Sequence, residues 1–234
     1  MGIFKTGTRK SPLALNQVKE LENKINTYFP GVKLEPVGID TTGDRDRKTP
    51  IDRLEGTDFF TDSIERALLE EKVDIAQHSA KDLPREFSPR LEIALVTGSI
   101  DPDDVLVSRE NLTLEQLPRG AVIGTSSKRR KRGLKNFRPD FKITDIRGNI
   151  HQRLELLDSS KNLDGIVIAA AGLIRLGLEE RISQRIPFEI IRPHPLQGKL
   201  AVQVRKADNR IKDFFKQLTG YKDFYRPKNI KKYL

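Results

Sequence analysis

Residues 121–132 read Ala-Val-Ile-Gly-Thr-Ser-Ser-Lys-Arg-Arg-Lys-Arg, and this stretch carries the pattern that decides the fold. Its short apolar run predicts a strand, its Gly-Thr-Ser-Ser segment predicts a turn, and the basic residues that follow predict a helix. The same order occurs near the N-terminus, where a predicted strand at residues 2–7 leads through Gly7-Thr8-Arg9-Lys10-Ser11 into a helix. Two similar openings indicate two α/β units of related plan.

Strands and helices alternate along both halves of the chain. Ser11-Pro12 predicts a helix start, because serine caps helices and proline suits their first turn. Asp62 with Glu65 predicts a capped helix over residues 63–71. The further strands are predicted at residues 32–39, 73–77, 91–96, 141–146 and 164–169. This alternation is typical of an α/β fold with mainly parallel sheets.

Two breaks in the pattern, at residues 98–103 and 192–198, predict where the chain crosses between the two units. The strand-like residues 200–204 need a sheet to join, so we expect the chain to return to the first unit. The predicted bounds are 1–98 and 195–217 for lobe 1, 101–192 for lobe 2, and 218–234 for a basic C-terminal tail.

The composition excludes several classes of protein. The 234 residues are 36% hydrophobic and 32% charged, which suits a packed core and excludes a disordered chain. No apolar run approaches the roughly 18 residues that a membrane helix needs, and the N-terminus has no secretory pattern, so we expect a cytoplasmic protein. Because cysteine is absent and the three histidines are scattered, we expect neither disulfides nor a metal site.

The net charge of +10 is concentrated at the end of the chain. Residues 199–234 contain eleven lysines and arginines against three aspartates. A basic segment can bind nucleic acid or improve solubility as a solvated tail, and we expect the second role. A further basic run, residues 128–132, could bind nucleic acid, but its place after a strand and a Thr-Ser-Ser loop suits a pocket for small anions better.

Chemistry-bearing residues follow the predicted strands, where ligands bind in parallel α/β sheets. Residues 78–82 (His-Ser-Ala-Lys-Asp) follow one strand, and residues 126–130 begin a helix whose free N–H groups and dipole favour an anion. A lone Lys-Asp pair or a lone arginine is usually an ordinary surface group. Arginines recur after the next strands, at Arg147, Arg153 and Arg175, and together they indicate a ligand with several carboxylates or phosphates.

These motifs together resemble those of the porphobilinogen deaminase family, whose members are also called hydroxymethylbilane synthases. The resemblance runs over about residues 3–206, in the family's order and spacing. The matching stretches are residues 7–15, 41–44, 78–84, 124–130, 145–149, 153–154, 169–178 and 197–198.

The resemblance implies a fold and a reaction. The family has two lobes like those of periplasmic solute-binding proteins, with the active-site cleft between them, and a small third domain. Its enzymes are transferases of tetrapyrrole (haem) biosynthesis that join four porphobilinogen units, with loss of ammonia, into hydroxymethylbilane. The pyrrole chain grows on a dipyrromethane cofactor.

The resemblance also implies roles for single residues. Asp82 matches the carboxylate that acts in the acid–base steps. Polar and cationic residues match those that bind substrate and cofactor, the cations by pairing with carboxylates. The implied binding residues are Arg9, Ser11, Lys81, Thr125, Ser127, Arg129, Arg130, Arg147, Arg153 and Arg175.

The chain departs from the family pattern in three places. The family attaches its cofactor by a thioether to a cysteine of the third domain, whereas this chain has no cysteine and stops at Leu234. A lysine of the family loop is Thr57 here, within residues 55–60, and the family's Gly-Gln-Gly reads Leu196-Gln197-Gly198. We therefore expect dipyrromethane to be held without a covalent bond or to be absent. The alternative function is a non-catalytic two-lobe protein that binds pyrroles or another polyanion.

Overall fold

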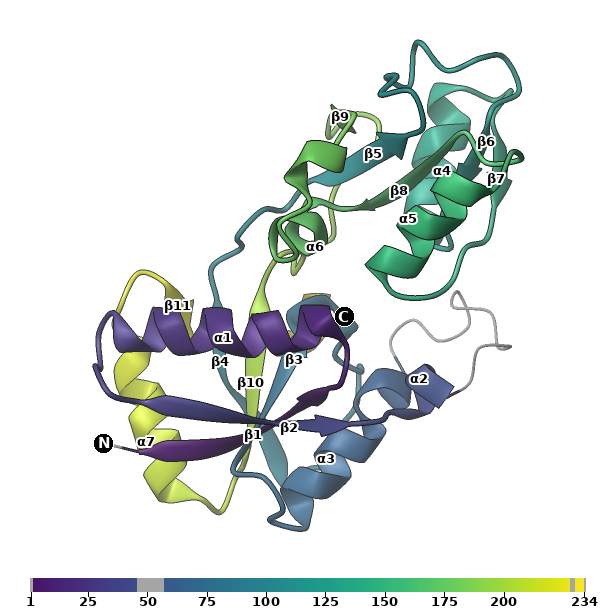
Figure 1. Ribbon diagram of the computed structural model, residues 1–234. Helices are drawn as coiled ribbons and strands as arrows, with labels where there is room; N and C mark the ends of the chain where they lie inside the picture. Colours follow the sequence, from purple (N-terminus) through teal and green to yellow (C-terminus); the bar gives the residue numbers. More distant parts are fainter. Residues whose placement is uncertain (1, 46–56, 228–229, 234) are drawn as a thin grey trace. The chain divides into compact units, whose positions relative to one another are not determined.

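Two α/β units make up the part of the chain that the computed structural model describes, residues 2–45, 57–227 and 230–233 (Figure 1). Among these residues, unit 1 contains those up to 100 and those from 198 onward, and unit 2 contains residues 101–197. The passages between the units fall inside the two predicted breaks. The predicted α/β fold class is confirmed.

Unit 1 contains a six-stranded sheet with the order β11-β4-β10-β3-β1-β2. Its strands are β1 (Ile3–Arg9), β2 (Lys33–Ile39), β3 (Ile75–Ser79), β4 (Leu91–Thr97), β10 (Leu200–Arg205) and β11 (Phe224–Tyr225). β1 is parallel to β2 and β3, whereas β10 is antiparallel to β3 and β4, and β11 is antiparallel to β4. β10 begins opposite the end of β3, with Leu200 beside Ser79, so it must run the other way.

Unit 2 contains a five-stranded sheet with the order β7-β6-β8-β5-β9. Its strands are β5 (Asp104–Ser108), β6 (Val122–Gly124), β7 (Lys142–Thr144), β8 (Gly165–Ala169) and β9 (Gln184–Arg185). β6 is parallel to β7 and β8, whereas β5 is antiparallel to β8 and β9. The prediction of mainly parallel sheets is therefore wrong, since both sheets are mixed. In each unit, a strand that follows a passage between the units enters antiparallel to its neighbour.

The helices connect the parallel strands, as the sequence pattern predicts. They are α1 (Pro12–Asn26), α2 (Thr42–Arg45), α3 (Asp62–Leu69), α4 (Lys128–Phe137), α5 (Ile150–Ser159), α6 (Ala170–Ile174) and α7 (Asn209–Leu218). Short 3-10 turns are η2 (Asp58–Phe60), η3 (Ala80–Asp82), η4 (Glu179–Arg181) and η5 (Ile230–Tyr233). The predicted capping pair of α3 is wrong: Thr61 is the N-cap residue, and the Asp62 carboxylate instead accepts the Thr42 hydroxyl at 2.6 Å.

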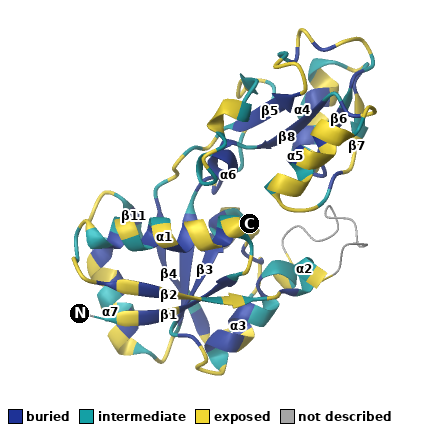
Figure 2. Cartoon of the chain, viewed as in Figure 1, coloured by how far each residue is buried: buried dark blue, intermediate teal, exposed yellow. Residues whose placement is uncertain are grey.

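Helices and buried strands form apolar cores on both faces of each sheet (Figure 2). In unit 1, α1 and α7 cover one core and α3 covers the other. In unit 2, α5 and α6 lie on one core and α4 on the other. None of the helices in the described part of the chain is long and apolar enough to cross a membrane. Burial of the sheet faces leaves the strand ends to carry the polar chemistry.

Ser11 is the N-cap of α1, as predicted, and its hydroxyl accepts a hydrogen bond from the Ala14 amide at 3.3 Å. Ser11→Ala should lower the free energy of unfolding by about 1 kcal/mol, because one amide of the first turn loses its partner. Urea denaturation measures this loss. The control is Ser159→Ala at an exposed position near the end of α5, which should change stability by less than about 0.5 kcal/mol. Equal losses in the two variants would contradict the capping role.

Candidate functional site

A polar pocket lies in unit 1 where β1 and β3 end. Its walls come from these two strand ends and from α1, η2, α3 and η3. The lining residues are Thr8, Arg9, Ser11, Leu13, Ala14, Gln17, Phe60, Thr61, Ile64, Gln77, His78, Ser79 and Asp82. The pocket brings together three predicted site residues, Arg9, Ser11 and Asp82. Asp82 is exposed at the end of η3, and Lys81 precedes it as a half-buried residue. The carboxyl ends of parallel strands are the usual place for ligands in such sheets.

Buried amide and hydroxyl groups form one wall of this pocket. The Thr8 hydroxyl donates to Gln77 Oε1 at 3.0 Å, and the Gln77 amide donates to Gln17 Oε1 at 3.4 Å. The Gln17 amide in turn donates to the Ser79 hydroxyl at 3.0 Å. Hydrogen bonds linked in this way fix the orientations of the amide and hydroxyl groups that the wall presents.

Arg9 is held at the pocket by an acidic and an aromatic neighbour. Its guanidinium pairs with the Asp44 carboxylate, and its central carbon lies 5.0 Å from the Phe60 ring centre. Burial alone would raise the pKa of Asp44, but the hydrogen bonds and charge of Arg9 and the Thr41 donors hold that pKa below its ordinary value. Asp44 lies in the motif at residues 41–44. This motif is part of the family resemblance, but the sequence analysis predicts no role for its aspartate.

His78, which lines the pocket, belongs to a buried chain of hydrogen bonds. Its Nε2 lies 3.1 Å from Gln203 Oε1, and the Gln203 amide donates to the Glu65 carboxylate at 3.1 Å. Since Gln203 turns its NH2 group toward Glu65, its oxygen faces His78, and the imidazole must carry its proton on Nε2. Burial lowers the pKa of His78 to about 4, although Gln203 and the Asp82 charge act in the opposite direction. The ring is therefore neutral near neutral pH.

The lowered pKa of His78 predicts a pH-dependent stability. In the unfolded chain a histidine takes up a proton near pH 6.5, whereas the folded chain resists this until about pH 4. The free energy of unfolding should therefore fall as the pH drops from about 6.5 toward 4. Denaturant titrations at several pH values measure the slope.

His78→Asn is the control for this pH dependence, because Asn does not titrate. Neighbouring Glu65 has a pKa raised by burial, so its contribution has the opposite sign and remains in both proteins. The slope between pH 6.5 and 4.5 should be clearly smaller in the variant. Identical slopes in the two proteins would contradict the neutral buried imidazole.

The other predicted site residues gather at one edge of the sheet of unit 2. Strands β7, β6 and β8 are parallel neighbours, so their carboxyl ends lie at the same edge. The loops and helices that follow them carry Thr125, Ser127, Arg129 and Arg130 after β6, Arg147 and Arg153 after β7, and Arg175 at the end of α6 after β8. The Ser126 hydroxyl donates to the Ile146 carbonyl at 2.7 Å, which ties the first two loops together. The topology thus brings these residues to one edge, as the sequence predicts.

Asp104 organises the two arginines that begin α4. Its carboxylate is fully buried and accepts from Arg130 Nε at 2.9 Å, from Arg130 Nη2 at 2.6 Å and from Arg129 Nη1 at 2.5 Å. Arg130 is buried and also donates to the Val167 carbonyl at 3.1 Å, whereas Arg129 keeps 29% of its side chain exposed. The structure gives Arg130 internal partners, and its contact with a ligand stays a prediction.

Asp104 is the residue of this edge that sequence reasoning missed. It begins β5, a strand that our predictions did not include, although the apolar run 105–107 was a signal for it. Gln197 adds a further contact, donating to Asp104 Oδ1 at 3.1 Å and to the carbonyls of Pro102 and Asp103. Its place in the motif at residues 197–198 did not reveal these partners.

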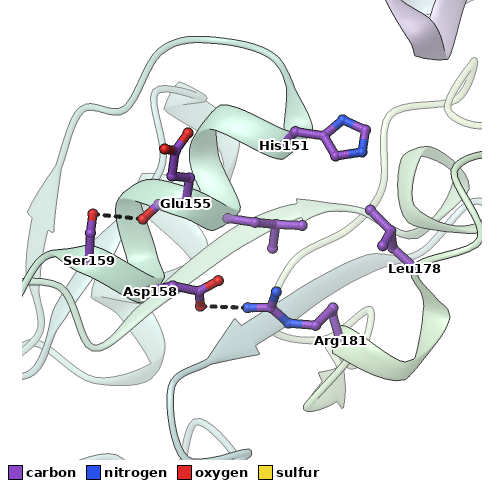
Figure 3. A pocket seen from close by; sticks show the side chains of 7 residues that line it. His151, Glu155, Asp158, Ser159, Leu178 and Arg181 are labelled. Carbon is purple, nitrogen blue, oxygen red and sulfur yellow. Dashed lines mark hydrogen bonds and ion pairs between the residues drawn. The ribbon is translucent and has the colours of Figure 1, made fainter.

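Another hollow on unit 2 contains none of the predicted site residues (Figure 3). It lies between α5 and the segment around η4, where Arg181 pairs with Asp158 at 2.7 Å. Its walls are His151, Leu154, Glu155, Asp158, Ser159, Leu178 and Arg181. The predicted residues thus fall into one set on unit 1 and another on unit 2. That both sets face one cleft stays a prediction.

Solved structures of low sequence identity share this fold. A variant of the OxyR2 regulatory domain from Vibrio vulnificus matches all of this chain and 97% of its own, with a TM-score of 0.53 and 17% identity. A variant of the BvgS VFT2 domain from Bordetella pertussis matches 94% of this chain and 88% of its own, with a TM-score of 0.51 and 12% identity. At these identities the likeness concerns the fold alone.

Sequence comparison identifies the family. The family profile described as "Porphobilinogen deaminase, dipyromethane cofactor binding domain" matches residues 4–213. The porphobilinogen deaminase of Natranaerobius thermophilus is 40% identical over 210 residues, which are 90% of this chain and 68% of the relative. That of Alkaliphilus metalliredigens is 43% identical over 208 residues, 89% of this chain and 66% of the relative. The chain spans about two thirds of the length of these relatives, and it belongs to the porphobilinogen deaminase family.

Proposed function

We propose that this chain is a transferase that joins four porphobilinogen units head to tail into hydroxymethylbilane. One ammonia leaves for each unit added, and water releases the product. The observation that carries the proposal is Asp82, an exposed carboxylate on a polar pocket shared with Arg9 and Ser11, in a chain of the porphobilinogen deaminase family. Family membership supports the substrate, and the pocket supports the residue that acts on it.

Asp82 is the group to which we assign the proton transfers. In each addition the bond from the aminomethyl carbon to nitrogen breaks, and the nitrogen leaves as ammonia after taking up a proton. The electron-poor carbon left behind is attacked by the free α-carbon of the pyrrole chain, which then loses its hydrogen as a proton. The carboxylic acid form of Asp82 can give the first proton, and the carboxylate that results can accept the second; its charge stabilises the positive character of the pyrrole N–H.

The cationic groups at the strand ends are the proposed partners of the pyrrole carboxylates. A dipyrromethane, which supplies the pyrrole end that is extended, carries four carboxylates. Carboxylates of this kind can pair with the arginines at the edge of unit 2. They can also accept from the backbone N–H groups at the start of α4, where the Ser127 side chain makes no capping hydrogen bond. The proposed binding residues are Arg9, Ser11, Lys81, Thr125, Ser127, Arg129, Arg147, Arg153 and Arg175, with Arg130 behind them. We propose that charge pairing with these side chains holds this group.

The proposal is tested by incubating the purified chain with porphobilinogen and measuring ammonia and linear tetrapyrrole. We expect both products in a ratio of four to one, after a lag that added dipyrromethane shortens and with a rate that falls as salt rises. A folded chain that binds porphobilinogen but releases no ammonia would contradict the transferase and favour the non-catalytic binding protein. Full turnover without a lag in high salt would contradict the reversible retention of the primer.

A further inference from the structure

Asp104 lies in an ion cluster with two arginines. Two guanidinium groups, from Arg129 and Arg130, share its one carboxylate. Burial alone would raise the pKa of Asp104, but the two arginines lower it below its ordinary value, so the carboxylate is ionised near neutral pH. Of these three side chains, Arg129 is the one that reaches solvent, since Asp104 and Arg130 are buried.

The contacts of Asp104 fix the orientation of Arg129. Asp104 Oδ2 accepts one Nη1 hydrogen of Arg129, and the same nitrogen donates to the Arg192 carbonyl at 2.6 Å. Asp104 itself is held by Arg130 and by the Gln197 amide. A guanidinium is planar, so fixing one of its nitrogens against two acceptors fixes the direction of its other donors.

We propose that Asp104 is a positioning residue that orients Arg129 toward a carboxylate or phosphate group of the ligand. The Asp104 carboxylate neutralises one positive charge at the site. It nevertheless strengthens anion binding, because it fixes the direction of the Arg129 donors. That the natural anion is a pyrrole carboxylate rests on the proposed function, whereas the positioning role does not. A site that acts through charge alone would bind anions more tightly without Asp104, so the two accounts differ in sign.

The test measures the affinity of the purified chain for inorganic pyrophosphate by calorimetry at low salt. Asp104→Glu keeps the charge but shifts the carboxylate by one methylene, and we expect it to weaken binding about tenfold, the value of roughly one charge-assisted hydrogen bond. Asp104→Asn should also weaken binding, although it removes a negative charge and so makes the site more positive. The matched control is Asp103→Asn, which removes the same negative charge from a neighbouring position. The Asp103 carboxylate pairs with exposed Arg185 at 2.7 Å, and the affinity of this variant for pyrophosphate should not fall.

A second comparison separates positioning from a general structural role. In an Arg129→Gln background, Asp104→Glu should cause little further loss of pyrophosphate affinity, because the donor that it orients is gone. Circular dichroism establishes which variants fold, and Asp104→Glu carries the test if Asp104→Asn does not fold. The inference would be overturned by tighter pyrophosphate binding in folded Asp104→Asn or by unchanged binding in Asp104→Glu. It would also be overturned if Asp104→Glu caused equal losses in both backgrounds, or if the wild type bound no pyrophosphate. Asp104-dependent binding without porphobilinogen turnover would support it while contradicting the proposed function.

Discussion

Asp82→Asn should lower the rate of tetrapyrrole formation at least about a hundredfold, because positioned acid–base groups typically contribute a factor of this size or more. The substitution keeps the shape of the side chain and removes its ability to give and take a proton. Since Asp82 is exposed, the fold and the affinity for porphobilinogen should change little. Ammonia release under saturating substrate measures kcat, and calorimetry measures binding.

The matched control is Asp213→Asn, which removes an exposed carboxylate from α7 and should leave turnover unchanged. A folded Asp82→Asn protein with near-normal kcat would contradict the acid–base role. If the variant lost affinity but kept kcat, Asp82 would act in binding and the proton transfers would need another group.

Phe215→Ala should lower the free energy of unfolding by about 3–5 kcal/mol, the usual cost of removing a fully buried phenylalanine. Phe215 lies on α7 with no exposed surface, and its ring centre is 6.1 Å from that of Phe4 and 5.2 Å from that of Phe214. The loss is a large part of the roughly 5–15 kcal/mol that stabilises a typical domain. Denaturant unfolding followed by circular dichroism measures it.

Phe188→Ala is the control for the core of unit 1, because the Phe188 side chain is 51% exposed and belongs to unit 2. It should change stability by less than about 0.5 kcal/mol. If both variants lost the same small amount, the segment from β10 to α7 would not complete the core of unit 1.

Local patterns explain what the sequence predicts well. The start of α1 follows from Ser11 and Pro12 alone, and the helix of α5 follows from Ile150, Leu154 and Leu157 on one face. The spacing of apolar residues and the residues that begin or end a helix depend on neighbouring positions, so a single sequence is enough to predict helices from them. The same holds for the arginines after successive strands, since parallel neighbours bring their ends to one edge.

Contacts between distant residues explain what the sequence predicts poorly. The direction of β10 and of β5 depends on the place where the chain enters the sheet after passing between the units. The residues of these two strands do not encode that place. The ion pair that Arg130 makes with Asp104, 26 residues away, has no local sign in the sequence. In the same way, Asp62 meets Thr42 twenty residues away and does not cap α3 as its spacing with Glu65 predicts.

The central claim of our account is that cationic side chains of this chain hold a growing pyrrole chain without a covalent bond. The most direct test incubates the chain with porphobilinogen, removes unbound material at low salt, and compares the protein mass under native and denaturing conditions. We predict pyrrole-bearing species in the native spectrum and the mass of the unmodified sequence after denaturation. A pyrrole adduct that survives denaturation, or a native protein that carries no pyrrole, would contradict this account.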